Sequence, residues 1–447
     1  MATTTDGASR LPRAVRPLRH PAYRWLAGNL AASVLAEGLW VVAVVWQVIA
    51  LGGGATAFSL VSGALALGAV LTALLGGVLA DRLPQRRILL VVAAMQVGAV
   101  GLVAGLSLTG TLGLPALVVV AAVIGVAGGL MFPAYSAVVP RLVPADELQA
   151  VNGLEGMLRP VLLSAVGPAI AGFVVAVAGP GVALGAVALA SAVALGCASM
   201  LPATPVLERG DGAAPTALAD LREGFRYMLV TRWLLVTLVF ACLMILAVLG
   251  PLEVLVPFAV KDRAGGGPGE HALVLACYGA GGVVGSFAAG SLRTPRRYLT
   301  AMIVMWSVAS LPLAVFGLAT SLWPMAVAGF LIGALFSAPQ VIWGTLLQRR
   351  VPPELLGRVS SLDFFVSLAF MPVSMALAGP ISGAVGLEPV FVVAALAPPV
   401  IGAVALLVGR LGPDELDHPL DVPTGPAATG ATGPGGPAEG ISSSSGS

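Results

Sequence analysis

Charged residues are too scarce in this sequence to coat the surface of a soluble protein of its size. Of the 447 residues, 58% are hydrophobic and 10% are charged, whereas soluble globular domains carry roughly 25% charged residues. A helix needs about 20 apolar residues to cross the hydrocarbon core of a bilayer. Residues 23–411 consist of apolar blocks of this length with short polar breaks. The sequence therefore predicts an all-α membrane protein embedded in the lipid bilayer.

The apolar blocks predict twelve transmembrane helices, six in each half of the chain. They are expected at residues 24–50, 57–80, 87–108, 113–138, 150–178, 181–201, 232–258, 271–292, 299–318, 323–347, 360–385 and 390–409. The expected organisation is a cytoplasmic N-terminal segment (1–22), a six-helix bundle (23–201), a linker (202–231), a second six-helix bundle (232–411) and a tail (412–447).

The linker and the tail differ in composition. In the linker, Leu218, Leu221, Phe225 and Met228 recur at helical spacing, which predicts an amphipathic surface helix. The tail is rich in Gly, Pro, Ala, Thr and Ser. Such a composition buries too little apolar surface to fold, so a disordered cytoplasmic tail is expected.

Basic residues indicate how the chain is oriented. With twelve spans, 20 arginines fall on the side of the two termini, and only Lys261 and Arg263 fall on the other side. Arg159 lies within a span. Loops rich in Lys and Arg stay in the cytoplasm, so both termini and the linker are expected there.

The two halves repeat at an offset of 208 residues. Gly77 falls on Gly285, and the acid Glu155 of the fifth span falls on Asp363 of the eleventh. Parallel repeats of six spans are typical of transporters that bind their substrate between the halves. The sequence thus predicts a small-molecule substrate and two six-helix bundles with pseudo-symmetry.

Several other functions find no support in the sequence. The net charge of +2 is too small to indicate nucleic acid binding, and the three cysteines lie singly in apolar segments. His20 and His418 lie outside the expected spans, and His271 lies at the very start of the eighth. We find no phosphate-binding loop or metal-ligand cluster. No enzymatic activity, metal or cofactor is expected, and the chain is expected to be monomeric.

The loop after the second span resembles motif A of the major facilitator superfamily, Gly-x-x-x-Asp-Arg-x-Gly-Arg-Arg. The matching residues are Gly77, Asp81, Arg82, Arg86 and Arg87, and Pro84 stands where the motif has Gly. Three further segments resemble the drug:proton antiporters that include macrolide efflux proteins and the enterobactin exporter. They are the sequence from Phe132 to Leu148 and, in the eleventh span, residues 361–364 and 377–380. The resemblance covers residues 18–411 and implies the twelve-helix major facilitator fold.

The resemblance also implies a cytoplasmic gate. In the family, the motif A aspartate contacts the start of the eleventh span, which places Asp81 near residues 357–361. Glu155, Arg159 and Asp363 lie near this end of the spans and are candidate gate residues. The alternative is a structural ion pair between Glu155 and Arg159, which are four residues apart on one helix face.

Glu37 is the candidate for proton coupling. It lies 13 residues into the first span, about 20 Å along the helix, and no basic residue is within one helical turn. A carboxyl at this depth is expected to be protonated much of the time, because burial disfavours its charged form. The alternative is a structural carboxyl that hydrogen-bonds a neighbouring helix or faces a wet vestibule.

Two further features bear on transport. Gly167, Pro168 and Gly172 in the fifth span partly match the antiporter motif C, with Leu163 and Ala171 in place of two of its glycines. They are expected to permit a bend and close packing against the eighth span. The fourth span lacks the arginine of motif B.

Glu253, near the outer end of the seventh span, is expected to be solvated in an outer vestibule, with an outer gate or a contact to a cationic substrate as alternatives.

The expected function is export of an amphiphilic small molecule by alternating access. The resemblance implies a proton antiporter, with a proton gradient as its energy source. An uncoupled facilitator or importer, or a nontransporting sensor on the same scaffold, remain alternatives. Polar and aromatic residues of the spans are candidates to line the substrate cavity: Asn29, Trp40, Gln47, Gln96, Tyr135, Phe240, Tyr278, Gln340, Trp343, Phe364 and Phe365.

Overall fold

A computed structural model of the chain describes residues 13–144, 147–203, 217–292 and 295–418. This part is helical and contains no strand. Twelve segments are long and apolar enough to cross a membrane, which confirms the predicted all-α membrane fold. The largest difference concerns the eleventh span, predicted as one helix over 360–385. It consists of α15 (Pro353–Leu368) and α16 (Met371–Val385), separated by a short turn.

The first half contains six spans. Its elements are η1 (Arg13–Arg19), α1 (Pro21–Ala50), α2 (Ala55–Arg82), α3 (Gln85–Leu108), α4 (Leu114–Leu142), α5 (Leu148–Pro160), the π-helical turn η3 (Val161–Val166), α6 (Gly167–Ala178) and α7 (Pro180–Ser199). The fifth span runs through α5, η3 and α6. Pro168 cannot donate to the carbonyl of Ser164, which explains why the helical register changes at η3.

The second half contains the other six. Its elements are α8 (Ala217–Val230), α9 (Arg232–Gly250), the π-helical turn η4 (Pro251–Leu255), α10 (Val256–Ala264), α11 (Pro268–Ser291), α12 (Tyr298–Ser310), α13 (Leu313–Leu318), α14 (Leu322–Arg350), α15, α16, α17 (Leu387–Gly409) and α18 (Leu411–Asp417). Pro257 removes the donor for the carbonyl of Glu253, so η4 has the same physical cause as η3.

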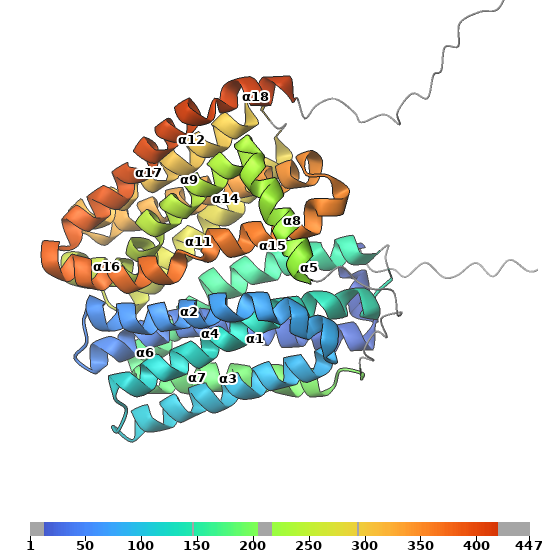
Figure 1. Cartoon of the computed structure of the whole chain (residues 1–447). Coiled ribbons are helices and arrows are strands. Elements are labelled where there is room, and N and C mark those ends of the chain that lie inside the picture. Colours follow the sequence, from blue (N-terminus) through green and yellow to red (C-terminus); the bar gives the residue numbers. More distant parts are fainter. Residues whose placement is uncertain (1–12, 145–146, 204–216, 293–294, 419–447) are drawn as a thin grey trace, which may run out of the picture.

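The two halves lie side by side, α1–α7 in one layer and α9–α18 in the other (Figure 1). We call the end of the bundle that carries Arg19 and His418 the terminus side, and the other end the opposite side. Equivalent glycines let helices approach within each half: Gly125 of α4 lies against Leu65 of α2, and Gly333 of α14 lies against Tyr278 of α11. These two glycines are 208 residues apart, so the repeat extends to the packing.

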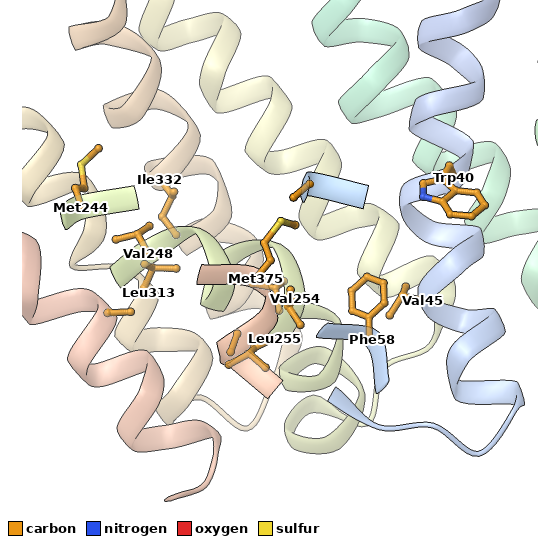
Figure 2. Close-up of a cluster of buried hydrophobic side chains, with 14 of the residues drawn as sticks. Trp40, Val45, Phe58, Met244, Val248, Val254, Leu255, Leu313, Ile332 and Met375 are labelled. Carbon is orange, nitrogen blue, oxygen red and sulfur yellow. The ribbon is translucent and has the colours of Figure 1, made fainter. Parts of the chain in front are cut away.

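Contacts between the halves form a seal on the opposite side. Gly379 of α16 donates its backbone N–H to Ser59 Oγ of α2 at 2.7 Å, and Ala376 lies against Gly63. The rings of Phe58 and Phe258 lie 6.2 Å apart. Figure 2 shows the apolar cluster at this seal, with Phe58 of α2 and Met375 of α16 near Val254 and Leu255 of η4. The seam is therefore closed toward the opposite side.

The linker and the tail depart in part from the prediction. The predicted amphipathic helix is present as α8, but Phe225 on its expected apolar face is exposed while Met228 is buried; the side chains of Leu218 and Leu221 lie outside the described residues. Residues 411–417 form α18 and do not begin a disordered tail. Residues beyond His418 lie outside the description.

The reason for α18 is a set of polar contacts that composition does not reveal. Glu415 is fully buried. Its carboxylate accepts hydrogen bonds from the backbone N–H groups of Leu299 and Thr300 at 2.8 and 3.1 Å, and from the Thr300 hydroxyl at 2.7 Å. An anion at the start of a helix is favoured by the helix dipole. Glu415 therefore caps α12 and fixes α18 in place.

Candidate functional site

Glu37 of α1 lies on the wall of an internal space. Its side chain is exposed, although the residue is deep among the helices and close enough to Arg159 for their charges to interact. Its helical neighbours Ala36, Gly38 and Leu39 are buried. An exposed carboxylate surrounded by protein faces an accessible space between helices, which is the kind of place where an intramembrane charge is usually functional.

A close helix crossing holds Glu37 beside the fifth span. A Cβ on Gly38 would lie 2.9 Å from the carbonyl oxygen of Leu163, and one on Gly167 would lie 2.7 Å from the Cα of Gly38. Only glycine at both positions allows α1 to pass this close to η3. The crossing brings Arg159, at the end of α5, toward Glu37.

The motif C-like residues act in packing at the start and in the middle of α6. Gly167 and Pro168 are buried, and Gly167 contacts α1 as just described. A Cβ on Gly172 would lie 2.9 Å from the backbone carbonyl oxygen of Pro268 on α11. The motif thus lies where α6 meets α1 in its own half and α11, the eighth span, in the other half.

Glu253 of η4 is a second carboxylate in the interior. Its side chain is exposed, while the following residues Val254 to Val260 are buried. It interacts electrostatically with Tyr278 of α11. Phe258 follows Glu253 by five residues toward the opposite side, so Glu253 lies on the inner side of the Phe58–Phe258 contact along the span. Its expected solvation in an outer vestibule stays a prediction.

Glu155 of α5 is held by an aromatic donor from α4. Tyr135 is fully buried and donates its hydroxyl to Glu155 Oε1 at 2.6 Å. The structure thus gives Tyr135 a partner inside its own half, and it does not line an open cavity. Tyr23 of α1 is also fully buried, close to both residues, and its hydroxyl has no partner in the described part of the chain.

Asp363 of α15 has the corresponding environment in the second half. Trp343 of α14, which is buried, donates its indole N–H to Asp363 Oδ2 at 3.0 Å. The Trp343 ring meets Trp233 of α9 edge to face at 6.2 Å. The guanidinium of Arg350 lies over Trp233 at 4.7 Å and pairs with Asp414 of α18 at 2.5 Å. A continuous series of contacts therefore links Asp363 to α18.

The motif A residues are described only in part. The side chains of Gly77, Asp81 and Arg82 lie outside the described residues, and so do those at Gly357, Arg358 and Ser361, where Asp81 was expected to dock. Arg86 donates to the backbone carbonyl of Ser199 at 2.7 Å, and Arg87 is exposed. Arg86 and Arg87 therefore lie at the terminus-side end of α3.

Most of the other predicted cavity residues pack between helices in this conformation. Asn29 donates to the carbonyl of Ala194 at 2.9 Å, and Gln47 accepts from the Ser107 hydroxyl at 2.7 Å. Both are buried, as is Trp40. These contacts tie α1 to α7 and α3, so the expectation that these side chains line the cavity is not met.

The remaining cavity candidates differ among themselves. Phe240 is buried and stacks on Trp306 at 6.4 Å, which makes it a packing residue. Gln96, Tyr278 and Phe365 are half-buried, and Gln340 is exposed. The side chain of Phe364 lies outside the described residues. Of these cavity candidates, Tyr278 has a charged neighbour in the interior, Glu253.

Sequence reasoning missed the aromatic partners Tyr23 and Trp233 and the terminus-side residues Arg350 and Glu415. The available signal was the repeat: Tyr135 and Trp343 are 208 residues apart, like Glu155 and Asp363. No group of three or more metal-ligating side chains occurs among the described residues.

Comparisons with known proteins agree with this fold. The family model for transmembrane secretion effectors matches residues 13–419. An MFS-type transporter of Sinorhizobium fredii, y4rN, is 30% identical over 68% of this chain and 75% of its own length. The multidrug efflux pump Tap of Mycobacterium tuberculosis is 28% identical over 90% of this chain and 97% of its own. The enterobactin exporter EntS of Shigella boydii is 28% identical over 77% and 81%.

Among solved structures, the nucleoside transporter NupG superposes with a TM-score of 0.67 over 86% of this chain and 99% of its own, at 14% identity. This likeness concerns the fold. The twelve spans, the paired halves and the family match together confirm the resemblance noted in the sequence. The chain belongs to the transmembrane secretion effector family of the major facilitator superfamily, and it is a multi-pass membrane transporter and not an enzyme.

Proposed function

We propose that this protein exports an amphiphilic small molecule from the cytoplasm, that protons move inward in exchange, and that the terminus side faces the cytoplasm. The orientation follows from the arginines, which gather on that side. Export is supported by the family match and by the efflux proteins among its relatives. The relatives include a multidrug efflux pump and an enterobactin exporter, so their cargo differs and the proposal names a broad class.

The observation that carries the coupling proposal is Glu37. It is a carboxylate in the middle of a membrane-spanning helix, on an internal space, behind a seal that closes the opposite side. A carboxyl in this position can take up a proton when the seal opens and release it when the terminus side opens. If the cargo and the proton occupy this space at different times, export of the cargo is coupled to inward movement of the proton.

The test is a pair of transport assays on the purified protein in proteoliposomes, with the Glu37→Gln variant. Gln keeps the size and hydrogen-bonding capacity of Glu but cannot lose or gain a proton. We expect export of a fluorescent amphiphile driven by a pH gradient to fall to background. Exchange of labelled for unlabelled amphiphile without a gradient is expected to persist, because exchange needs no net proton movement.

A matched control is Glu388→Gln, an exposed carboxylate at the start of α17, which should leave both assays unchanged. Gradient-driven export by Glu37→Gln at the wild-type rate would refute the coupling role of this residue. Exchange without any response of the wild type to a pH gradient would instead identify a facilitator.

A further inference from the structure

Each half presents one carboxylate in an equivalent hydrogen bond. Tyr135 of α4 donates to Glu155 of α5, and Trp343 of α14 donates to Asp363 of α15, at 2.6 and 3.0 Å. Donor and acceptor are 20 residues apart in both pairs, and the pairs are related by the offset of 208. The donors are chemically different, a phenol and an indole. The shared feature is one aromatic hydrogen-bond donor directed at one carboxylate.

A second aromatic residue completes each site. Tyr23 of α1 lies near Tyr135 and Glu155, and Trp233 of α9 contacts Trp343. Tyr23 and Trp233 stand near the starts of the first and seventh spans, which are equivalent in the repeat. Tyr23 is fully buried, and its hydroxyl has no hydrogen-bond partner among the residues that the structure describes. A buried polar group without a partner is costly, so its position beside Glu155 requires a reason other than packing.

Each carboxylate keeps an oxygen for another donor. The described part of the chain offers no hydrogen bond to Glu155 Oε2, and Asp363 Oδ1 receives only a long one, 3.5 Å, from Ser367. Both side chains are half-buried and so reach accessible space. A charged carboxylate in a membrane protein is stable only when its remaining lone pairs find a positive or donating group.

The interior charges identified above are unbalanced. Among the side chains that the structure describes, they comprise four carboxylates, Glu37, Glu155, Glu253 and Asp363, and one guanidinium, Arg159, which already has a partner. A surplus of carboxylates favours a positively charged occupant over a neutral or anionic one.

We propose that Glu155 and Asp363 are two equivalent binding sites, one in each half, for the ammonium group of an organic cation, and that Tyr135 and Trp343 are their positioning residues. The aromatic donor fixes one carboxylate oxygen and leaves the other directed at the cargo. This inference rests on the proposed export function and specifies its cargo as an amphiphilic cation entering from the terminus side.

The test measures binding of dansylcadaverine, a fluorescent amphiphile whose primary ammonium group is charged near neutral pH and donates N–H hydrogen bonds, to the full-length protein in nanodiscs at constant pH. We expect Glu155→Gln and Asp363→Asn each to weaken binding about tenfold, as for loss of a charge-assisted contact. Tyr135→Phe and Trp343→Phe should weaken it about fivefold, since the carboxylate remains but is no longer fixed.

Two variants separate positioning from folding. Trp343→Tyr restores a donor of the kind that the other half uses, and it should recover most of the affinity lost in Trp343→Phe. Trp306→Phe is the matched control, because this buried indole donates to the backbone carbonyl of Phe336 at 3.3 Å and not to a carboxylate. It should bind like the wild type.

Wild-type affinity in both acid variants would overturn the inference and leave the two pairs as structural ties. Retained binding combined with loss of pH-driven transport would also overturn it, because the carboxylates would then be proton sites. If the wild type exports a neutral amphiphile but does not bind the cation, the inference fails while the export function stands. Absence of any transport by the wild type would refute the export function itself.

Discussion

Replacing Gly379 by Ala should open the seal on the opposite side. Gly379 lies in α16 where this helix meets α2 of the other half, and a Cβ there would lie 2.6 Å from the carbonyl carbon of Ala55, whereas ordinary contacts begin at 3.4 Å. The same residue donates the buried hydrogen bond to Ser59. The methyl group must therefore separate the two helices, and the hydrogen bond lengthens with them.

The expected magnitude follows from two contributions. Overpacking by one methyl group costs about 2 kcal/mol, and loss of the hydrogen bond adds about 1 kcal/mol. The higher helix propensity of Ala acts equally in the sealed and open states, so it does not offset these costs. A total of about 3 kcal/mol raises the population of the open state on the order of 100-fold.

The assay is labelling of a cysteine placed behind the seal. Glu253→Cys, in a chain whose three native cysteines are replaced by serine, reports access from the opposite side through its reaction with a membrane-impermeant maleimide. Gly379→Ala should accelerate this reaction by one to two orders of magnitude. Gly383→Ala is the control, because its Cβ would find only Thr56 Oγ1, at 3.7 Å. Equal labelling rates in the two variants would show that the seal does not depend on this contact.

Two further predictions concern stability. Glu415→Ala removes three hydrogen bonds from the buried start of α12. It should lower the free energy of unfolding by about 3 kcal/mol, seen as a lower melting temperature in detergent. The control Asp417→Asn changes an exposed residue and should melt like the wild type; equal melting temperatures of the two variants would contradict the capping role of Glu415. Gly125→Ala places a methyl group 2.8 Å from the carbonyl carbon of Leu65 and should destabilise by about 2 kcal/mol. Gly128→Ala on the same helix has no atom within 4 Å and should be neutral or stabilising; the reverse order of the two melting temperatures would refute the packing argument.

The spans could be predicted because hydropathy is a local property. Every backbone polar group in the bilayer must be satisfied within its own segment, so about 20 apolar residues already specify a helix. The ends of helices were harder. The helix α18 depends on contacts with distant residues, such as Glu415 with α12, and composition alone assigned it to a disordered tail.

The site was predictable in its charges and less so in its aromatic residues. Glu37, Glu155, Arg159 and Asp363 stood out because charge is rare in a membrane span. Aromatic residues are common there, so nothing in the sequence distinguished Tyr135 and Trp343, which hold carboxylates, from Phe240, which only packs.

The sequence by itself determined the membrane environment, the twelve spans, the repeat and the family, because each depends on residue type at a given position or on a local motif. Only the tertiary structure decided which charges face an internal space, which aromatic residues orient them, and on which side the halves are sealed. Those properties depend on distances between helices, and such distances are set by close contacts such as Gly38 with Gly167 and Gly379 with Ala55. A glycine in the sequence does not reveal which helix will lie against it.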